Sequence, residues 1–212
     1  MKIVDLTHLI EISMPVYPGT EPPQLDEANK IVTDGFAEKR ISMHSHTGTH
    51  MDAPAHMLAN SKTLDQYGLS EFYGNAVMVD FSVTPVERMG LERLAQYQDL
   101  LEKASFLVLR TGWAKRWGQA DYFNGFPALT PQAAKWLVGL GIRGIGVDAI
   151  SIDRMEDSDF PIHNILFNAG VFVIENLANL RELGQEFVLG CFPLKIKDAD
   201  GAPARVAAFS AE

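Results

Sequence analysis

Four of the six histidines of this 212-residue chain lie within thirteen residues, from His44 to His56, together with Asp52. Imidazole nitrogens and carboxylate oxygens are ligands that divalent transition metals prefer. Burying several of these groups together costs free energy unless their lone pairs and N–H groups find partners. The chain must therefore fold so that this segment forms a polar site, and a bound metal ion is the partner that best explains it.

For this segment the sequence predicts a strand followed by a tight turn. Apolar and polar residues alternate over 40–46, which predicts a strand with His44 and His46 on the same face. Gly48 permits backbone angles that are closed to other residues. We therefore expect a turn that brings His50 back toward His46.

From residue 76 onward, short apolar runs alternate with segments of helical periodicity. This alternation predicts an α/β fold with a mixed, partly parallel sheet flanked by helices. The last two strands flank a turn signal at 198–201, which predicts an antiparallel hairpin. No repeat or linker interrupts the pattern, so we expect residues 1–212 to form one domain. The expected strands are 77–81, 106–109, 145–147 and 171–174, and the expected helices are 91–103 and 132–140.

Charge and composition exclude several functions. The formal net charge is −9 and Lys and Arg form no cluster, which argues against a nucleic-acid partner. No apolar run approaches the roughly 18 residues of a membrane-spanning helix, and the N-terminus does not resemble a signal peptide. The single cysteine, Cys191, excludes an intrachain disulfide and is expected in a buried strand. We expect a cytoplasmic protein that acts on a small molecule, without a membrane partner.

Further metal ligands must come from elsewhere in the chain, and two residues are candidates. His163 lies in the segment 160–164, which we interpret as a loop. Glu175 follows four apolar residues at the end of a predicted strand, where α/β proteins often place functional groups. A carboxylate at that position could also be a solvated strand end, but the histidine-rich segment favours a ligand.

The spacing His46-x-Gly48-Thr49-His50-x-Asp52-x-Pro54-x-His56 resembles the signature of the cyclase family of metal-dependent hydrolases. That family includes the bacterial kynurenine formamidases. The resemblance covers nearly the whole chain and implies a swivelling β/β/α fold. The other segments that carry it are Asp5–Thr7, Pro18–Gly19, Gly146–Asp148, Ser151–Asp153 and the pair His163 and Glu175.

The resemblance implies a site for two divalent ions, with zinc as the first choice and manganese as the alternative. His46 and His50 would hold the first ion, His163 the second, Asp52 and Glu175 would bridge both, and His56 would be the catalytic acid or base. Carboxylates suit the bridging role because they have two oxygens, whereas a neutral imidazole offers one lone pair. The resemblance also implies a homodimer in which an N-terminal loop reaches the pocket of the partner.

The implied reaction is hydrolysis of a C–N bond in an amide other than a peptide, as in an arylformamidase. A metal-bound water would attack the formamide carbonyl, and His56 would pass a proton to the leaving amine. Tyr17 stands where the formamidases carry a tryptophan that contacts an aromatic substrate. It still offers an aromatic wall, so we expect a planar aromatic substrate, with N-formylkynurenine as the first candidate.

Two alternatives to the arylformamidase function remain open. The enzyme could open a cyclic amide or lactone, as isatin hydrolases of the same family do. The chain could also be a metal-dependent binding protein without turnover, although such a protein would not need His56.

Several other polar residues have two open interpretations. His44 and His8 either support the site or are structural. Asp148, Ser151 and Asp153 either buttress the site or cap the turn that follows their strand.

Overall fold

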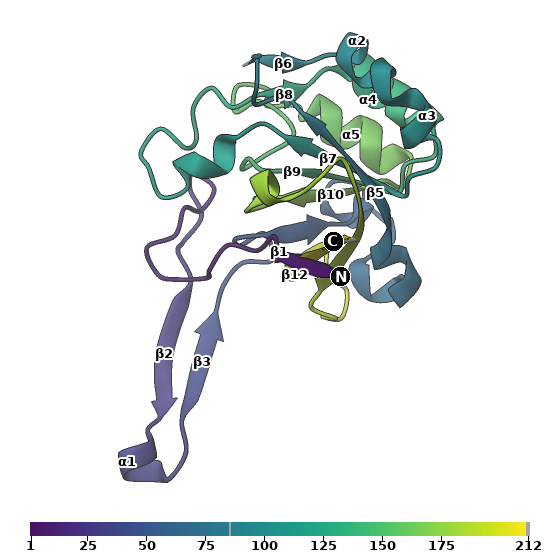
Figure 1. Ribbon diagram of the computed structural model, residues 1–212. Helices are drawn as coiled ribbons and strands as arrows, with labels where there is room; N and C mark the ends of the chain where they lie inside the picture. Colours follow the sequence, from purple (N-terminus) through teal and green to yellow (C-terminus); the bar gives the residue numbers. More distant parts are fainter. Residues whose placement is uncertain (85, 211–212) are drawn as a thin grey trace.

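In the computed structural model, which describes residues 1–84 and 86–210, seven strands form a closed ring (Figure 1). Closure occurs because the short strand β4 (His50–Asp52) pairs with β10 (Phe172–Glu175) on one side and with β12 (Gly201–Ser210) on the other. The ring runs β12, β11, β5, β7, β9, β10 and β4, and β1 (Lys2–Asp5) pairs with the C-terminal end of β12, on the edge whose other end pairs with β4. The remaining ring strands are β5 (Tyr73–Asp80), β7 (Phe106–Arg110), β9 (Gly144–Val147) and β11 (Glu186–Pro193).

The sheet is mixed, as predicted. Strands β5, β7, β9 and β10 are parallel to one another, whereas the pairs that involve β4, β11 and β12 are antiparallel. The predicted C-terminal hairpin is present as β11 and β12. Closure of the sheet into a ring was not predicted, because it depends on a three-residue strand that no periodicity reveals.

The parallel strands bury both faces. On β5, Val77 and Val79 pack toward the helices, whereas Ala76 and Met78 point into the ring. The ring interior also contains Cys191, which is fully buried as expected. The helices that cover the parallel strands are α2 (Leu91–Leu94), α3 (Gln98–Leu101), α4 (Pro131–Gly139) and α5 (Pro161–Asn168) (Figure 1).

Helix α4 has the ends that the sequence predicts. The Thr130 hydroxyl accepts a hydrogen bond from the Ala133 N–H, and Pro131 occupies the first turn. By contrast, the expected helix over 91–103 is divided. Helices α2 and α3 are separated by a 3-10 turn, and each places one fully buried leucine, Leu94 and Leu101, into the core.

A two-stranded arm projects away from the ring (Figure 1). It consists of β2 (Gln24–Asn29) and β3 (Glu38–Ser42), with the short helix α1 (Ile31–Asp34) at its tip. The predicted strand over 40–46 is wrong at its C-terminal end, because β3 stops at Ser42 where its partner β2 begins. His44 and His46 therefore lie in the following loop and turn and do not share a strand face.

Shorter elements complete the described chain. A two-stranded parallel pair is formed by β6 (Arg88–Met89) and β8 (Ala128–Leu129). The 3-10 turns are Pro54–His56, Leu64–Gln66, Leu69–Phe72, Ala95–Tyr97, Trp113–Arg116 and Leu180–Glu182. Among the helices of the described residues, none is both long and apolar enough to cross a bilayer.

Candidate metal centre and active site

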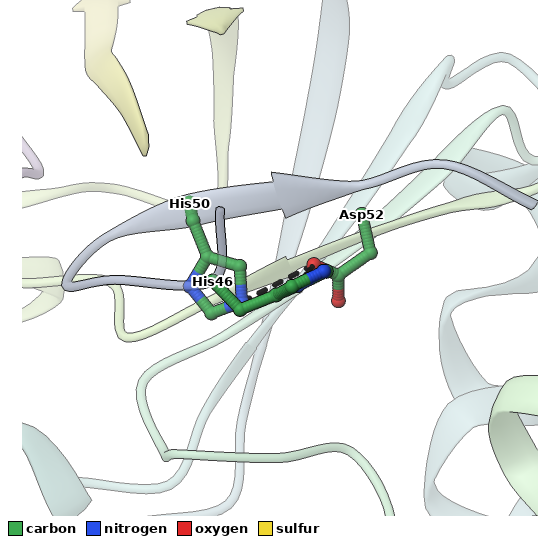
Figure 2. A group of neighbouring side chains, drawn as sticks. All are labelled: His46, His50 and Asp52. Carbon is green, nitrogen blue, oxygen red and sulfur yellow. Dashed lines mark hydrogen bonds and ion pairs between the residues drawn. The ribbon is translucent and has the colours of Figure 1, made fainter. Parts of the chain in front are cut away.

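Strand β4 presents His50 and Asp52 to the site. Met51, between them, packs in the ring interior, so the alternation of a strand turns its two neighbours to the opposite face. The turn before the strand is made at Gly48, which has a φ of +67° as expected. Figure 2 shows the imidazoles of His46 and His50 directed toward the carboxylate of Asp52.

The hydrogen bonds of His50 determine which nitrogen faces the site. Its Nδ1 donates to the Gly48 carbonyl oxygen at 2.8 Å, so Nε2 carries the lone pair of the neutral ring. This Nε2 is buried and has no hydrogen-bond partner among the described residues. It lies 3.1 Å from Oδ1 of Asp52 and 3.5 Å from Oε2 of Glu175. A cation between these atoms would satisfy a buried nitrogen that is otherwise left unpaired.

His163 faces the same two carboxylates from the other side. Its Nε2 lies 3.4 Å from Oε1 of Glu175 and 3.8 Å from Oδ2 of Asp52. Each carboxylate therefore directs one oxygen toward His50 and the other toward His163. Ligands about 2.0–2.1 Å from a tetrahedral zinc ion are separated by about 3.3 Å, and most of these distances are close to that value.

The placement of His163 corrects the expectation that it lies in a loop. Pro161 begins helix α5, because proline is tolerated in the first turn where its missing N–H has no helical partner. The buried carboxylate of Asp153 accepts hydrogen bonds from the N–H groups of Ile162 and His163 and from His163 Nδ1, at 2.8, 2.9 and 2.7 Å. Asp153 thus both caps the helix and orients the imidazole, as carboxylates commonly do behind metal ligands.

Glu175 is the last residue of β10 and pairs in register with His50 of β4. The Ile152 N–H donates to its Oε1 at 3.1 Å. The site therefore lies at the carboxyl ends of the parallel strands β9 and β10, where we expected functional groups.

His46 and His56 lie next to each other at the outer side of the group. The His46 Nδ1 is 2.6 Å from Asp52 Oδ1, and its Nε2 is 2.7 Å from Asp200 Oδ2. The ring of His56 lies 3.8 Å from that of His46, and its Nδ1 is 3.2 Å from the same Asp200 oxygen. Among the described residues, three groups could each hold an ion: His46 with His50 and Asp52; Asp52 with His163 and Glu175; and His46 with His56 and Asp200.

The electrostatics of the site favour a cation. Burial opposes the charged form of each imidazole, yet Asp52 and Glu175 raise the pKa of His50, and Asp153, Asp52 and Glu175 raise that of His163. Asp52 and Asp200 likewise overcome burial and raise the pKa of His46 to about 10. The pKa of His56 moves the other way, because burial and the neighbouring His46 charge lower it. The carboxylates thus draw positive charge into the inner group, and divalent ions would take the place of those protons.

One cavity of about 450 Å³ lies beside the site. The side chains of the site that border it are His46, His50, Asp52, His56, His163 and Glu175. Its wall combines the histidines and carboxylates with the aromatic rings of Tyr17 and Phe160 and the side chains of Met57 and Ile150. A pocket with an apolar wall and a few convergent polar groups is the usual form of a small-molecule site. Tyr17 is among the residues that line this cavity.

The residues with open roles are now located. His44 lies at the cavity rim, where its Nε2 is 2.9 Å from Oε2 of Glu21. His8 stacks on Trp117 with ring centroids 4.0 Å apart, away from the cavity. Asp148 accepts hydrogen bonds from Thr111 and Gly112 and so holds a loop rather than a ligand. Ser151 lines the cavity, and its hydroxyl accepts from the Asp153 N–H.

Sequence reasoning missed Asp200. The segment 198–201 was interpreted as a turn, and its two aspartates explained as turn residues. Asp200 stands directly before Gly201, where an aspartate is an ordinary turn residue, so the local sequence carries no signal of a second role.

Comparison with known proteins agrees with this geometry. The Cyclase family model matches residues 4–154, which is more than half of the chain. The chain belongs to the Cyclase family. The kynurenine formamidase of Bacillus thuringiensis subsp. konkukian (strain 97-27) is 30% identical over 204 residues, covering 95% of this chain and 94% of that protein.

Solved structures resemble the whole chain. Isatin hydrolase A from Labrenzia aggregata, bound to benzyl benzoate, is 31% identical with a TM-score of 0.90, over 100% of this chain and 94% of that one. A potential metal-dependent hydrolase with cyclase activity is also 31% identical, with a TM-score of 0.83, over 100% of this chain and 98% of that one. The predicted family and the predicted enzyme class, a metal-dependent hydrolase of C–N bonds, are confirmed.

Proposed function

We propose that this enzyme hydrolyses the formamide group of an arylformamide, with N-formylkynurenine as the first substrate to test. The observation that carries the proposal is the pair of buried carboxylates, Asp52 and Glu175, each of which directs its two oxygens toward two different histidines beside the cavity. The relatives named kynurenine formamidase support the choice of amide.

We infer that His46 and His50 hold a first divalent ion, that His163 holds a second, and that Asp52 and Glu175 bridge the two. The unpaired, buried Nε2 of His50 supports this assignment. Zinc is the first choice and manganese the second, because nitrogen and oxygen ligands suit both ions. When bound, two such ions lower the pKa of water and stabilise negative charge on a carbonyl oxygen.

His56 is proposed as the acid or base that carries a proton to the leaving amine. Its side chain is 30% exposed and lines the cavity, so it can reach a substrate. Its lowered pKa favours the neutral imidazole near neutral pH, which is the form that can accept a proton. The role of ligand, in the group with His46 and Asp200, is the competing assignment.

The apolar part of the cavity supports an aromatic substrate. Tyr17 and Phe160 offer ring faces, and the ring of a planar acyl compound can stack on such faces. A cyclic amide or lactone is the second candidate, and it is favoured by the likeness to isatin hydrolase A.

One experiment separates these candidates. The protein is depleted of metal, reconstituted with zinc or manganese, and assayed with N-formylkynurenine and with isatin. We expect hydrolysis of N-formylkynurenine at the higher kcat/KM. Preference for isatin would favour the cyclic amide, and no turnover of either compound at full metal occupancy would contradict both substrate assignments.

We also propose that residues 1–212 act as one domain of the swivelling β/β/α type in a cytoplasmic homodimer. The β2–β3 arm supports the dimer, because Ile31, Val32 and Phe36 at its tip are exposed. Apolar side chains on a projecting arm lose contact with water when they pack on a second copy. Light scattering on the purified protein tests the oligomeric state.

A further inference from the structure

The turn between β11 and β12 lies against the imidazole of His46. Asp200, the last residue before β12, places Oδ2 at 2.7 Å from His46 Nε2 and 3.2 Å from His56 Nδ1. One oxygen atom therefore contacts both a proposed metal ligand and the proposed acid or base.

Asp200 completes a pattern among the three proposed histidine ligands. In each ring, the nitrogen that faces away from the ligand group has an oxygen partner: the Gly48 carbonyl for His50, Asp153 for His163 and Asp200 for His46. Such partners set the tautomer and the ring orientation of metal-binding histidines. In His46 this arrangement leaves Nδ1 directed at Asp52.

The backbone holds the turn close to the ring. The Ala53 N–H donates to the Asp200 carbonyl oxygen at 2.9 Å, and Gly201 pairs with Asp52 in the sheet. A Cβ atom on Gly201 would collide with the His46 ring, so the glycine permits this approach. The position of the Asp200 carboxylate is thus determined by the β4–β12 pairing and by the absence of a side chain at the next residue.

We propose that Asp200 is a positioning residue that orients His46 toward the first ion and His56 toward the substrate. This inference rests on the proposed function for the part that concerns His56. Since a single oxygen serves both rings, removal of the carboxylate disturbs metal binding and proton transfer together.

The test compares Asp200→Asn with Asp198→Asn. Asp198 lies in the same turn, its side chain is 71% exposed, and its φ of +57° is one that asparagine tolerates, so this control makes the same charge change. Competition with a zinc chelator should show that Asp200→Asn weakens zinc binding by about 10–100-fold. The Asp198→Asn control should bind zinc like the wild type.

Kinetics at saturating zinc test the contact between Asp200 and His56. With N-formylkynurenine, Asp200→Asn should lower kcat by about 10–100-fold with little change in KM, because the residue orients a proton-transfer group and not the substrate. In a His56→Ala background the same substitution should cause little further loss, since residues that act through one another are not additive.

Two results would overturn the proposal. Wild-type zinc affinity in Asp200→Asn would show that the carboxylate does not position His46, and an equal fall in kcat in both backgrounds would show that it does not act through His56. If the wild type hydrolyses neither N-formylkynurenine nor isatin, the proposed function fails instead, while the zinc competition still decides the role of Asp200. Should Asp200→Asn fail to fold, Asp200→Ser replaces it in both measurements.

Discussion

At the scale of single residues, His56 is held differently from the other histidines of the site. The other three each direct a nitrogen toward Asp52, and His50 and His163 are buried. His56 is partly exposed to the cavity and contacts Asp200. His46 is also partly exposed, at 22% against 30% for His56, so its contact with Asp52, and not its exposure, distinguishes this proposed ligand from His56.

We predict that His56→Ala retains its metal and loses most of its activity. General acid–base catalysis contributes about 10²–10⁴-fold to rate, so kcat should fall by a factor in that range. Elemental analysis of the reconstituted variant should match the wild type, whereas His50→Ala should lose metal and activity together. A His56→Ala protein that binds less metal would identify His56 as a ligand and contradict the assignment.

A second prediction at the scale of single residues concerns Tyr17. If its ring stacks on the substrate, Tyr17→Ala should raise KM for N-formylkynurenine, because an aromatic pair is worth roughly 0.5–1.5 kcal/mol beyond the area it buries. Tyr17→Trp should preserve or lower KM. Steady-state kinetics on the three proteins provide the measurement, and an unchanged KM in Tyr17→Ala would remove Tyr17 from substrate binding.

At the scale of elements, the arm formed by β2 and β3 contributes little to the folding of its own chain. All five residues of β3 are exposed, and Val32 at the tip is 97% exposed. Because so little of the arm is buried, packing against its own chain contributes little to its stability. This is the physical reason to propose that the arm packs on a second subunit.

Accordingly, Val32→Asp should dissociate the proposed dimer and leave the thermal stability of the subunit nearly unchanged. A charge placed in an apolar contact costs free energy on association, whereas the substituted side chain is solvated in the monomer. Val83→Asp is the matched control, since Val83 is 76% exposed but lies outside the arm. Light scattering with a melting curve checks both variants, and a Val32→Asp dimer of wild-type affinity would exclude the tip as the contact.

At the scale of the whole molecule, the proposed ligands join parts of the chain that are distant in sequence. Asp52 lies on β4, His163 on α5 and Glu175 on β10, and β4 is also the strand that closes the ring. Ions bound between them would therefore connect the helical layer to the closing strand. Metal should stabilise the entire fold rather than one loop.

Metal removal should accordingly lower the melting temperature. An ion present at 100 times its Kd stabilises the folded state by about 2.7 kcal/mol, which corresponds to roughly 5–10 °C for a chain of this size. Calorimetry of the chelated protein should show this shift on addition of zinc. Calcium, which prefers oxygen ligands, should not produce it, and neither should zinc added to His50→Ala. Equal melting temperatures with and without zinc would contradict a site that joins these elements.

Much of this site could be predicted from residues that are close in sequence. The spacing from His46 to His56 places four side chains of the site on one turn, one short strand and the 3-10 turn after it, so local backbone geometry alone brings most of them together. The parallel strands β5, β7, β9 and β10 were also predictable, because residues buried on both faces form continuous apolar runs.

Contacts between distant segments were decided by the tertiary structure. Asp200 meets His46 across 154 positions of sequence, and the ring closes through the pairing of β4 with β12. Neither can be read from local pattern, because three-residue strands and turn aspartates have no periodicity of their own. The residue types of the metal centre were therefore determined by sequence, whereas the packing of β12 against β4 decided which carboxylate orients His46 and lies beside His56.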